Sequence, residues 1–547
     1  MDNAWTADWR GRERCVLFAA GHDESLLDHW RSDPQRPRHL HIIACAAGPL
    51  PGFERTIEQA PGVTLDLLHA DPLHALGQLR ARIDAVWLPA GCAVDSERFA
   101  RALARLLARD AVLHADAIDL NLRTALEASG WQFHSPSQAR FVTRKPIAPM
   151  PPPPIRRAIV IGAGLAGAAA CQRLCARGWH VILLERHPAA AMEASGNLAG
   201  ISMPLLSKDD NQASRLARAA YSYARAYWHS LGGVGRTIEG DNCGVVLAAR
   251  DVKHASLQAA IAAAQPLPPD YAQWCDARAA AARWPGVAPF GAWWFEGGSW
   301  IRPGSAIAAM LAACGDNLTA RFGTGDVQLR RSEAGWEAVD ASGAVLAAAP
   351  TVIVASGGAA FAQTAALPLQ RVRGQVTHLA QASEPGLQRD YVLCREAYLT
   401  PAAGGTHSMG ATYDDDDDPA LRPSSQHENL AHLRAMLADP AAALDAPLAG
   451  RVGFRAVATD RLPMVGAVPD ATFEVGAERL RELPRQEGVY CLLGYASRGL
   501  IWAPLAAELL AASLEGEPLP LEGALVDALD PGRFLLRERR TKRQPLR

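Results

Sequence analysis

The stretch "RAIVIGAGLAGAAACQRLCARGWHVILLE", from Arg157 to Glu185, decides the fold of the larger part of this chain. Its pattern predicts an apolar strand, a tight turn, a helix and a second apolar strand. The turn has the spacing Gly162-x-Gly164-x-x-Gly167, in which glycine lets backbone amides approach a pyrophosphate at the helix N-terminus. Glu185 ends the second strand, where a carboxylate can bond a ribose hydroxyl. The stretch therefore predicts a Rossmann-type dinucleotide-binding unit.

Three further features favour FAD over NAD as the dinucleotide. Residues 186–206 are rich in small and polar side chains where a simple dehydrogenase would continue with another helix, so they suit backbone contacts to a longer cofactor. A predicted strand within residues 351–358 ends in small residues and can close on the same cofactor. Residues 488–514 predict a strand, a Gly/Ser/Arg turn and a helix whose N-terminal dipole end would face a flavin.

Length and composition exclude several classes of protein. With 547 residues, 49% hydrophobic and 20% charged, the chain can form two or three domains. Its formal net charge of -2 neither supports nor excludes an RNA partner. The 10 cysteines include no CxxC pair, so we expect reduced, buried thiols and no metal site. Because the sequence has no secretory signal and no apolar run that could span a bilayer, we expect a cytoplasmic protein without a membrane partner.

A proline-rich segment over residues 148–156 predicts a stiff spacer, since proline favours extended backbone. It divides an N-terminal domain, residues 1–147, from a larger domain, residues 157–534, which a basic tail follows at residues 535–547. The acidic run from Asp414 to Asp418 is expected to form a solvated loop, with a metal site as the minor alternative.

Six segments of the larger domain carry a more specific pattern. They are "ASGNLAG" (194–200), "PLLSKDDN" (204–211), "RGQVTHL" (373–379), "YLTP" (398–401), "GFRAVATDRLPMVGAVPD" (453–470) and "GYASRGLIWAPLAAELLAA" (494–512). In this order they resemble the flavin-dependent domain of the MnmC family, which modifies the wobble uridine of tRNA. The resemblance implies an α/β fold of the glycine and D-amino-acid oxidase type, with an FAD-binding Rossmann domain and an antiparallel-sheet substrate region.

The resemblance also implies a reaction. The substrate would be 5-carboxymethylaminomethyluridine, often 2-thiolated, in a tRNA anticodon. FAD would oxidise the C–N bond of its glycine-like arm, and hydrolysis of the imine would leave aminomethyluridine and glyoxylate. Molecular oxygen would then accept the electrons. The oligomeric state stays open, with a monomer as one possibility.

The cofactor-binding residues are expected along the glycine turn and the segments that follow it. They are Gly162, Ala163, Gly164, Leu165, Ala166, Gly167, Glu185, Arg186, Ser195, Gly196, Asn197, Gly200, Val327, Ala355, Ser356, Gly357, Ser497, Gly499 and Leu500. The resemblance puts Ser195, Gly196, Asn197 and Gly200 along FAD near the flavin.

Two arginines and a tyrosine are the candidate catalytic residues. A planar guanidinium binds a carboxylate through two hydrogen bonds and keeps its charge. Arg455 resembles the residue that holds the substrate carboxylate in glycine oxidases, and Arg498 is the second candidate. Tyr398 can orient the amine or the carboxylate. The alternatives are a salt bridge for each arginine, and for Tyr398 a buried hydroxyl bonded to the backbone.

Other residues have competing interpretations. Arg371 and Arg373 begin a predicted strand whose Gly374 passes near the substrate, and we expect the two arginines to lie on a solvated edge, with phosphate or substrate contact as the alternative. Trp293, Trp294 and Trp300 can stack on an unpaired base, although core packing is the commoner role. The basic tail can follow a tRNA backbone or remain disordered.

The N-terminal domain departs from the family pattern. Its order of strands and helices resembles the family's Rossmann-like methyltransferase half, but it is shorter and appears without that half's N-terminal extension. The positions that would hold S-adenosylmethionine are Gly21 to Glu24, Ala44 to Ala46 and Leu88 to Ala90, and none suits it. S-adenosylmethionine is therefore a doubtful cofactor. We expect a decayed module without methyl transfer, retained for docking, stability or tRNA contact.

Two other functions compete with the tRNA oxidoreductase. A free-standing oxidase of small amines or amino acids would act on glycine or sarcosine without tRNA. A non-catalytic tRNA-binding protein would keep FAD as a structural cofactor. Arg455 and the glycines of the turn are present, which argues against the second alternative.

Overall fold

The computed structural model describes residues 9, 11–57, 62–92, 94–142, 153–333, 335–381, 387–437, 448–472 and 477–543. The chain separates into two compact units. Unit 1 comprises Met1–Pro154 and Leu509–Val526, and unit 2 comprises Ile155–Glu508 and Asp527–Arg547. Of the predicted proline spacer, residues 148–152 lie outside the described residues.

Residues 509–526 were expected in the larger domain, but they belong to unit 1. The reason is a set of hydrogen bonds that join this segment to residues far from it in the sequence. Arg55 donates to the carbonyl of Pro518 over 2.7 Å, and the amide of Leu519 donates to the carbonyl of Arg80 over 3.0 Å. This segment therefore completes the N-terminal fold, although the prediction assigned it to the other domain.

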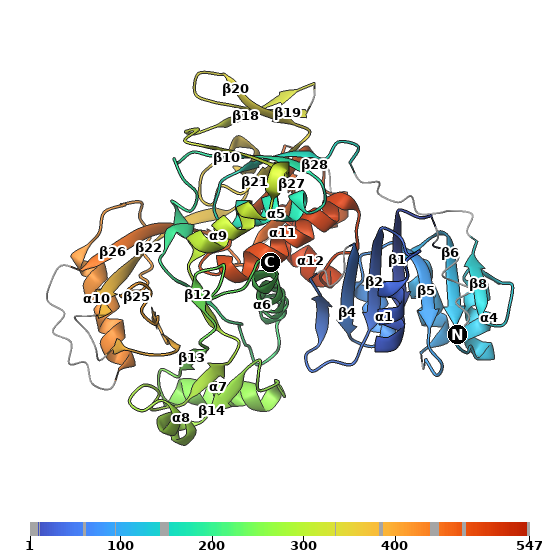
Figure 1. Ribbon diagram of the computed structural model, residues 1–547, viewed down its shortest axis with the longest axis horizontal. Coiled ribbons are helices and arrows are strands. Elements are labelled where there is room, and N and C mark those ends of the chain that lie inside the picture. Colours follow the sequence, from blue (N-terminus) through green and yellow to red (C-terminus); the bar gives the residue numbers. More distant parts are fainter. Residues whose placement is uncertain are drawn as a thin grey trace. The chain divides into compact units, whose positions relative to one another are not determined.

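Unit 1 is one sheet with helices, in which β1, β2, β4, β5 and β6 run parallel (Figure 1). The sheet order is β3-β4-β2-β1-β5-β6-β8-β7. Its elements are β1 (Arg14–Ala19), α1 (Glu24–Ser32), β2 (His39–Cys45), β3 (Gly52–Arg55), β4 (Val63–His69), α2 (Pro72–Gln78), β5 (Ile83–Leu88), α3 (Ser96–Ala104), β6 (Leu107–Ala115), α4 (Leu120–Ala128), β7 (Trp131–Phe133) and β8 (Gln138–Phe141). The predicted Rossmann-like methyltransferase remnant is confirmed.

Unit 2 contains the predicted Rossmann sheet, with the order β17-β10-β9-β21-β28-β27. Only β27 runs antiparallel in it, and β18, β19 and β20 form a separate antiparallel sheet. The strands are β9 (Arg157–Ile161), β10 (His180–Glu185), β17 (Leu318–Phe322), β18 (Gln328–Ser332), β19 (Gly335–Val339), β20 (Val345–Ala349), β21 (Thr351–Val354), β27 (Met464–Pro469) and β28 (Arg485–Leu493). Short apolar strands such as β9 and β21 are buried because helices cover parallel sheets.

A second, mixed sheet of eight strands has the order β14-β15-β13-β23-β24-β25-β22-β26. All its pairs are antiparallel except β13 with β23. Its strands are β13 (Val245–Ala248), β14 (Gln273–Cys275), β15 (Ala292–Phe295), β22 (Leu369–Ala380), β23 (Val392–Cys394), β24 (Tyr398–Leu399), β25 (Thr406–Gly410) and β26 (Ala449–Ala458). Strands β11 (Gly200–Ser202), β12 (Gly240–Asp241) and β16 (Ser299–Ile301) form a further small sheet. The predicted antiparallel substrate region is thus present.

The helices of unit 2 begin with α5, which follows the glycine turn (Figure 1). They are α5 (Leu165–Cys175), α6 (Gln212–Ser230), α7 (Val252–Ala264), α8 (Ala277–Arg283), α9 (Pro303–Ala312), α10 (Pro423–Met436), α11 (Gly499–Glu515), α12 (Gly523–Leu529) and α13 (Arg533–Arg543), with α11 and α12 each continuing into or out of unit 1. No helix in the described part of the chain is long and apolar enough to cross a membrane.

The three tryptophans between residues 293 and 300 lie largely in the core. Trp293 and Trp300 are buried, so core packing accounts for them, while Trp294 is half-buried.

The basic tail is helical as far as Arg543, and Arg537 pairs with Asp460 over 2.9 Å. Of the two alternatives for the tail, disorder does not apply to its described residues, because an acidic partner in unit 2 holds this helix.

Candidate active site

A cavity of about 530 Å³ lies in unit 2 between the Rossmann sheet and the mixed sheet. This volume is within the usual range for cofactor and ligand pockets. The predicted residues that line it are Gly162, Gly164, Leu165, Ala166, Glu185, Arg186, Ser195, Asn197, Gly200, Val327, Ala355, Ser356, Gly357, Tyr398, Arg455, Ser497, Arg498, Gly499 and Leu500. Segments from most of the length of unit 2 thus meet at one cavity.

Three predicted cofactor-binding residues do not line this cavity. The backbone amide of Ala163 donates to Glu185 Oε2 over 2.7 Å. A Cβ at Gly167 would lie 1.8 Å from the carbonyl oxygen of Gly162, and a Cβ at Gly196 would lie 2.4 Å from Nη2 of Arg451. Gly167 and Gly196 therefore permit close packing, and Ala163 helps to orient Glu185.

The glycine turn packs so closely against neighbouring backbone that a side chain at Gly162 would clash. Gly162 has φ of 103°, and a Cβ there would lie 2.7 Å from the carbonyl oxygen of Ala355. Gly164 caps α5 without a side-chain hydrogen bond, and the amide of Leu165 donates to Ser195 Oγ over 3.2 Å. The positive end of the helix dipole at this turn suits a pyrophosphate. These features fit the diphosphate of a dinucleotide.

Glu185 is positioned for the ribose of such a cofactor. Its side chain is buried, Oε2 accepts from Ala163 and Oε1 accepts from the amide of His187 over 2.9 Å. An ionised carboxylate has about four acceptor positions, so lone pairs remain for a hydroxyl. The turn, the helix end and this carboxylate together fit FAD, and the residues that would hold it are those of the turn and the ends of β10 and β21.

The N-termini of α5 and α11 come together at the cavity. A Cβ at Gly499 would lie 3.0 Å from Cδ1 of Leu165, and a Cβ at Gly200 would lie 2.7 Å from Cδ1 of Leu500. Glycine at these two positions allows the two helix ends and β11 to approach. Two positive helix ends thus face one cavity, which suits an anionic cofactor and a ring that gains charge on reduction.

Arg455 reaches the cavity from β26 and has no carboxylate partner among the described residues. Its Nη1 donates to the carbonyl of Thr412 over 3.1 Å, and its guanidinium lies 4.2 Å from the ring centroid of Tyr413. The remaining N–H groups are available to a ligand. The alternative of a salt bridge for this arginine is not what the described residues show.

Tyr398 and Arg498 share the same cavity. Burial raises the pKa of Tyr398 to about 12, and no described residue forms a hydrogen bond with its hydroxyl. Arg498 precedes α11, and burial lowers the pKa of its guanidinium, which still remains charged. Among the described residues, Arg498 forms no salt bridge and Tyr398 forms no hydrogen bond with the backbone, which were the alternative roles. A neutral hydroxyl and a second cation therefore line the cavity.

Sequence reasoning missed Arg451 and Tyr413. Arg451 donates to Asn197 Oδ1 over 3.2 Å and to the carbonyl of Met192 over 2.8 Å, so it fixes the segment around Asn197. It is four residues before Arg455 on β26, and alternation along a strand puts both on one face. This spacing was the available signal. Tyr413 had none, because it lies outside any regular element.

Arg373 and the acidic run form a structural network, contrary to expectation. Arg373 is fully buried and pairs with Asp414 over 2.8 Å, and Arg422 pairs with Asp416 over 2.7 Å and with Asp418 over 2.8 Å. The prediction that Arg373 lies on a solvated edge is wrong. The acidic loop forms salt bridges with Arg373 and Arg422. Arg371 is exposed, lines the cavity and pairs with Asp417 over 3.2 Å. Among the described residues, no acidic, histidine or cysteine group is arranged to hold a metal.

The carboxyl edge of the unit 1 sheet has no carboxylate at the end of β2, where the prediction looks for one to bind S-adenosylmethionine. A Cβ at Gly21, after β1, would lie 2.9 Å from Cγ of Pro89, after β5, so glycine at this position lets the two loops approach closely. Strand β2 ends in Cys45, and burial raises the pKa of its thiol to about 12. A neutral thiol replaces the carboxylate that would accept from a ribose.

The fold and the cavity define an FAD-dependent oxidoreductase. The family model described as FAD dependent oxidoreductase matches residues 157–513. Glycine oxidase from Geobacillus kaustophilus has the same fold, with a TM-score of 0.56 and 20% identity over 69% of this chain and 99% of its own. Iminodiacetate oxidase from Chelativorans sp. BNC1 matches with a TM-score of 0.53 and 24% identity over 66% of this chain and 96% of its own.

The more specific family follows from similarity over the whole chain. The proteins named tRNA 5-methylaminomethyl-2-thiouridine biosynthesis bifunctional protein MnmC from Azoarcus sp. (strain BH72) and Aromatoleum aromaticum are 39% and 38% identical to it. Each match covers 98% of this chain and 92% of the relative. The chain therefore belongs to the MnmC family, and the predicted resemblance and its FAD cofactor are confirmed.

Proposed function

We propose that this protein oxidises the C–N bond of the carboxymethylaminomethyl arm on the wobble uridine of tRNA, with or without 2-thiolation. Its relatives carry a name that specifies biosynthesis of 5-methylaminomethyl-2-thiouridine in tRNA. The products are aminomethyluridine and glyoxylate. Two electrons and two protons leave the arm to give an imine, water hydrolyses the imine, and molecular oxygen accepts the electrons as hydrogen peroxide.

The observation that carries this proposal is an unpaired guanidinium in the cofactor cavity. Arg455 faces the cavity with its remaining donors free, and Arg498 adds a second cation. A carboxylate binds such a fork through two hydrogen bonds. The glycine-like arm of the substrate ends in a carboxylate, so Arg455 would fix that end and orient the adjacent methylene.

The glycine turn, Glu185 and the helix ends would hold FAD, which supplies two-electron oxidation of the amine when bound. Tyr398 stays protonated at neutral pH and can accept from the amine or donate to the carboxylate. No histidine of the described residues lines the cavity. The chain's contribution is therefore orientation and charge, which are large terms in such reactions.

Unit 1 is proposed to have lost methyl transfer. The support for this is that β2 ends in the neutral thiol of Cys45, where a carboxylate would be needed to accept from a ribose hydroxyl.

The test is nucleoside mass spectrometry on tRNA that carries the carboxymethylaminomethyl group, incubated with purified protein, with and without S-adenosylmethionine. Aminomethyluridine in both samples is the expected result. Methylaminomethyluridine with the methyl donor would contradict the loss of methyl transfer. Oxidation of glycine or sarcosine with no change in tRNA would replace the proposal with a small-amine oxidase.

A further inference from the structure

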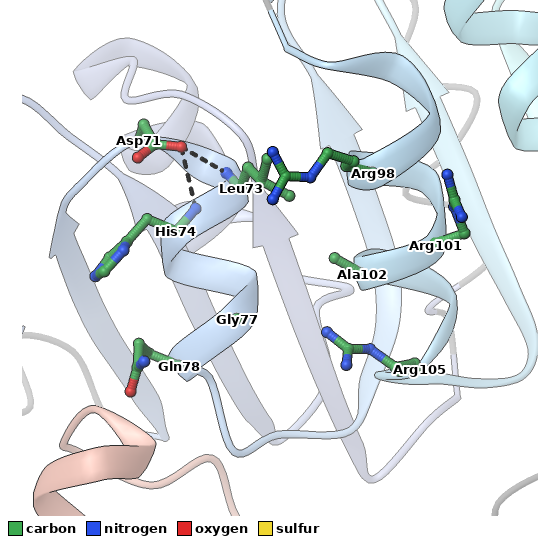
Figure 2. A pocket seen from close by; sticks show the side chains of 9 residues that line it. All are labelled: Asp71, Leu73, His74, Gly77, Gln78, Arg98, Arg101, Ala102 and Arg105. Carbon is green, nitrogen blue, oxygen red and sulfur yellow. Dashed lines mark hydrogen bonds between the residues drawn. The ribbon is translucent and has the colours of Figure 1, made fainter.

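Unit 1 has a basic groove between α2 and α3 that the proposed oxidation does not use. Its volume is about 720 Å³, and the lining residues are Asp71, Leu73, His74, Gly77, Gln78, Arg98, Arg101, Ala102 and Arg105. Figure 2 shows Arg98 and Arg105 extending from α3 toward α2, whereas Arg101 points away. Two cations therefore face one side of this groove.

The charges of Arg98 and Arg105 are not neutralised within unit 1. No described residue forms an ion pair or a side-chain hydrogen bond with either guanidinium, and both residues are exposed. Arg101, in contrast, pairs with Glu97 over 2.9 Å. The one acid of the lining, Asp71, caps α2 by accepting from the amides of Leu73 and His74 over 3.1 and 3.0 Å (Figure 2). The groove thus keeps a net positive charge.

An exposed arginine also occurs on the solvated face of any amphipathic helix. Helix α3 has such a face, because Phe99, Ala100, Ala102 and Leu103 are buried on its other side. Solvation of this helix face does not by itself explain why two unpaired guanidinium groups point into the same groove. Seven residues separate them, or about 10 Å along a helix, so each can reach a different phosphate of one strand.

We propose that the groove between α2 and α3 binds the phosphate backbone of the tRNA substrate. This inference rests on the proposed function, since tRNA is the polyanion that the protein would meet. Arg98 and Arg105 donate to phosphate oxygens of the bound strand. Phosphate contacts position a nucleic acid without reading its sequence. Unit 1 thereby contributes substrate affinity without methyl transfer.

The test measures binding of an unmodified tRNA transcript by the full-length, FAD-loaded protein over a range of salt concentrations. The double variant Arg98→Gln/Arg105→Gln should weaken binding about tenfold, and the slope of log K against log salt should fall in magnitude by about 1.4 to 1.8, since each of the two phosphate contacts contributes about 0.7 to 0.9. The matched control is Arg38→Gln/Arg123→Gln, which removes the exposed Arg38 and the half-buried Arg123, which already pair with Glu13 and Glu127 over 3.5 and 3.0 Å.

Loss of affinity and slope in the groove variant but not in the control supports the proposal. Equal effects in both variants, unchanged binding in the groove variant, or no binding by the wild type would overturn it. Circular dichroism and flavin absorbance confirm that each variant is folded and loaded. Oxidation of modified tRNA is measured separately, so binding that depends on the groove without oxidation would contradict the proposed function alone.

Discussion

Gly374 on β22 lies directly against the guanidinium of Arg455 on β26. A Cβ built on Gly374 would stand 2.1 Å from Nη1 of Arg455. The two strands pair along their length, with Val372 opposite Arg455 and Gly374 opposite Gly453. The missing side chain of Gly374 thus makes the space that the candidate carboxylate anchor occupies.

Gly374→Ala should move the Arg455 side chain while the fold is kept. The clashing atom is the far end of a flexible side chain, and Gly374 does not have a positive φ. We expect kcat/KM for the modified tRNA to fall roughly 10- to 100-fold, about 1.4 to 2.7 kcal/mol, with the melting temperature little changed. Gly304→Ala is the control, because its Cβ would make an ordinary 3.9 Å contact with Ala191. Unchanged kinetics in Gly374→Ala would contradict this role of the glycine.

Arg455→Ala should retain bound FAD and lose most of the oxidation of the carboxymethylaminomethyl arm. Hydrogen bonds to a charged group contribute about 1.5 to 3 kcal/mol, so a loss of kcat/KM of roughly 100-fold is expected. Arg455→Lys should recover part of it, because lysine keeps the charge but not the planar fork. Steady-state kinetics together with flavin absorbance measure both properties. Normal oxidation by Arg455→Ala would mean that another residue holds the carboxylate.

Gly162→Ala should impair cofactor binding itself. At this residue φ is 103°, which disfavours an L side chain, and the new Cβ would lie 2.7 Å from a backbone carbonyl that has little freedom to move. We expect reduced flavin content after purification and a lower melting temperature, with excess FAD restoring part of both. Full flavin occupancy in this variant would show that the turn is not required for FAD.

Tyr398 should stay protonated across the pH range in which the enzyme is assayed. Burial raises its pKa to about 12, so ionisation begins only well above pH 10 in the folded protein. In an unfolded chain the phenol ionises near pH 10, so its contribution to stability is complete below that pH and is lost between about pH 10 and pH 12. Tyr398→Phe should lower kcat/KM about tenfold without changing the shape of its pH profile from pH 7 to 9. A new ionisation in that window for the wild type alone would contradict the expected protonation.

The local pattern of the sequence was enough for the Rossmann unit and for most of the cavity. The glycine turn, the apolar strands and Glu185 act through short-range backbone geometry, so their spacing predicted the site at which β9, β10 and α5 meet. Ala163 and Gly167 lie in these same segments, and Gly196 lies in the segment after β10, but all three serve packing or orientation. A sequence pattern identifies such a segment without stating which of its residues face the ligand.

The sequence by itself determined the βαβ unit, the type of cofactor and the family, because these depend on neighbouring residues and on motifs in order. Only the tertiary structure decided which arginines carry free charge. Arg373 and Arg455 lie on paired strands, yet Arg373 is buried against Asp414, whereas Arg455 has no described carboxylate partner. Likewise, Arg101 is neutralised by Glu97, while Arg98 and Arg105 face the groove. The availability of a charge depends on which acid the fold brings within about 4 Å, and separation along the chain does not encode that distance.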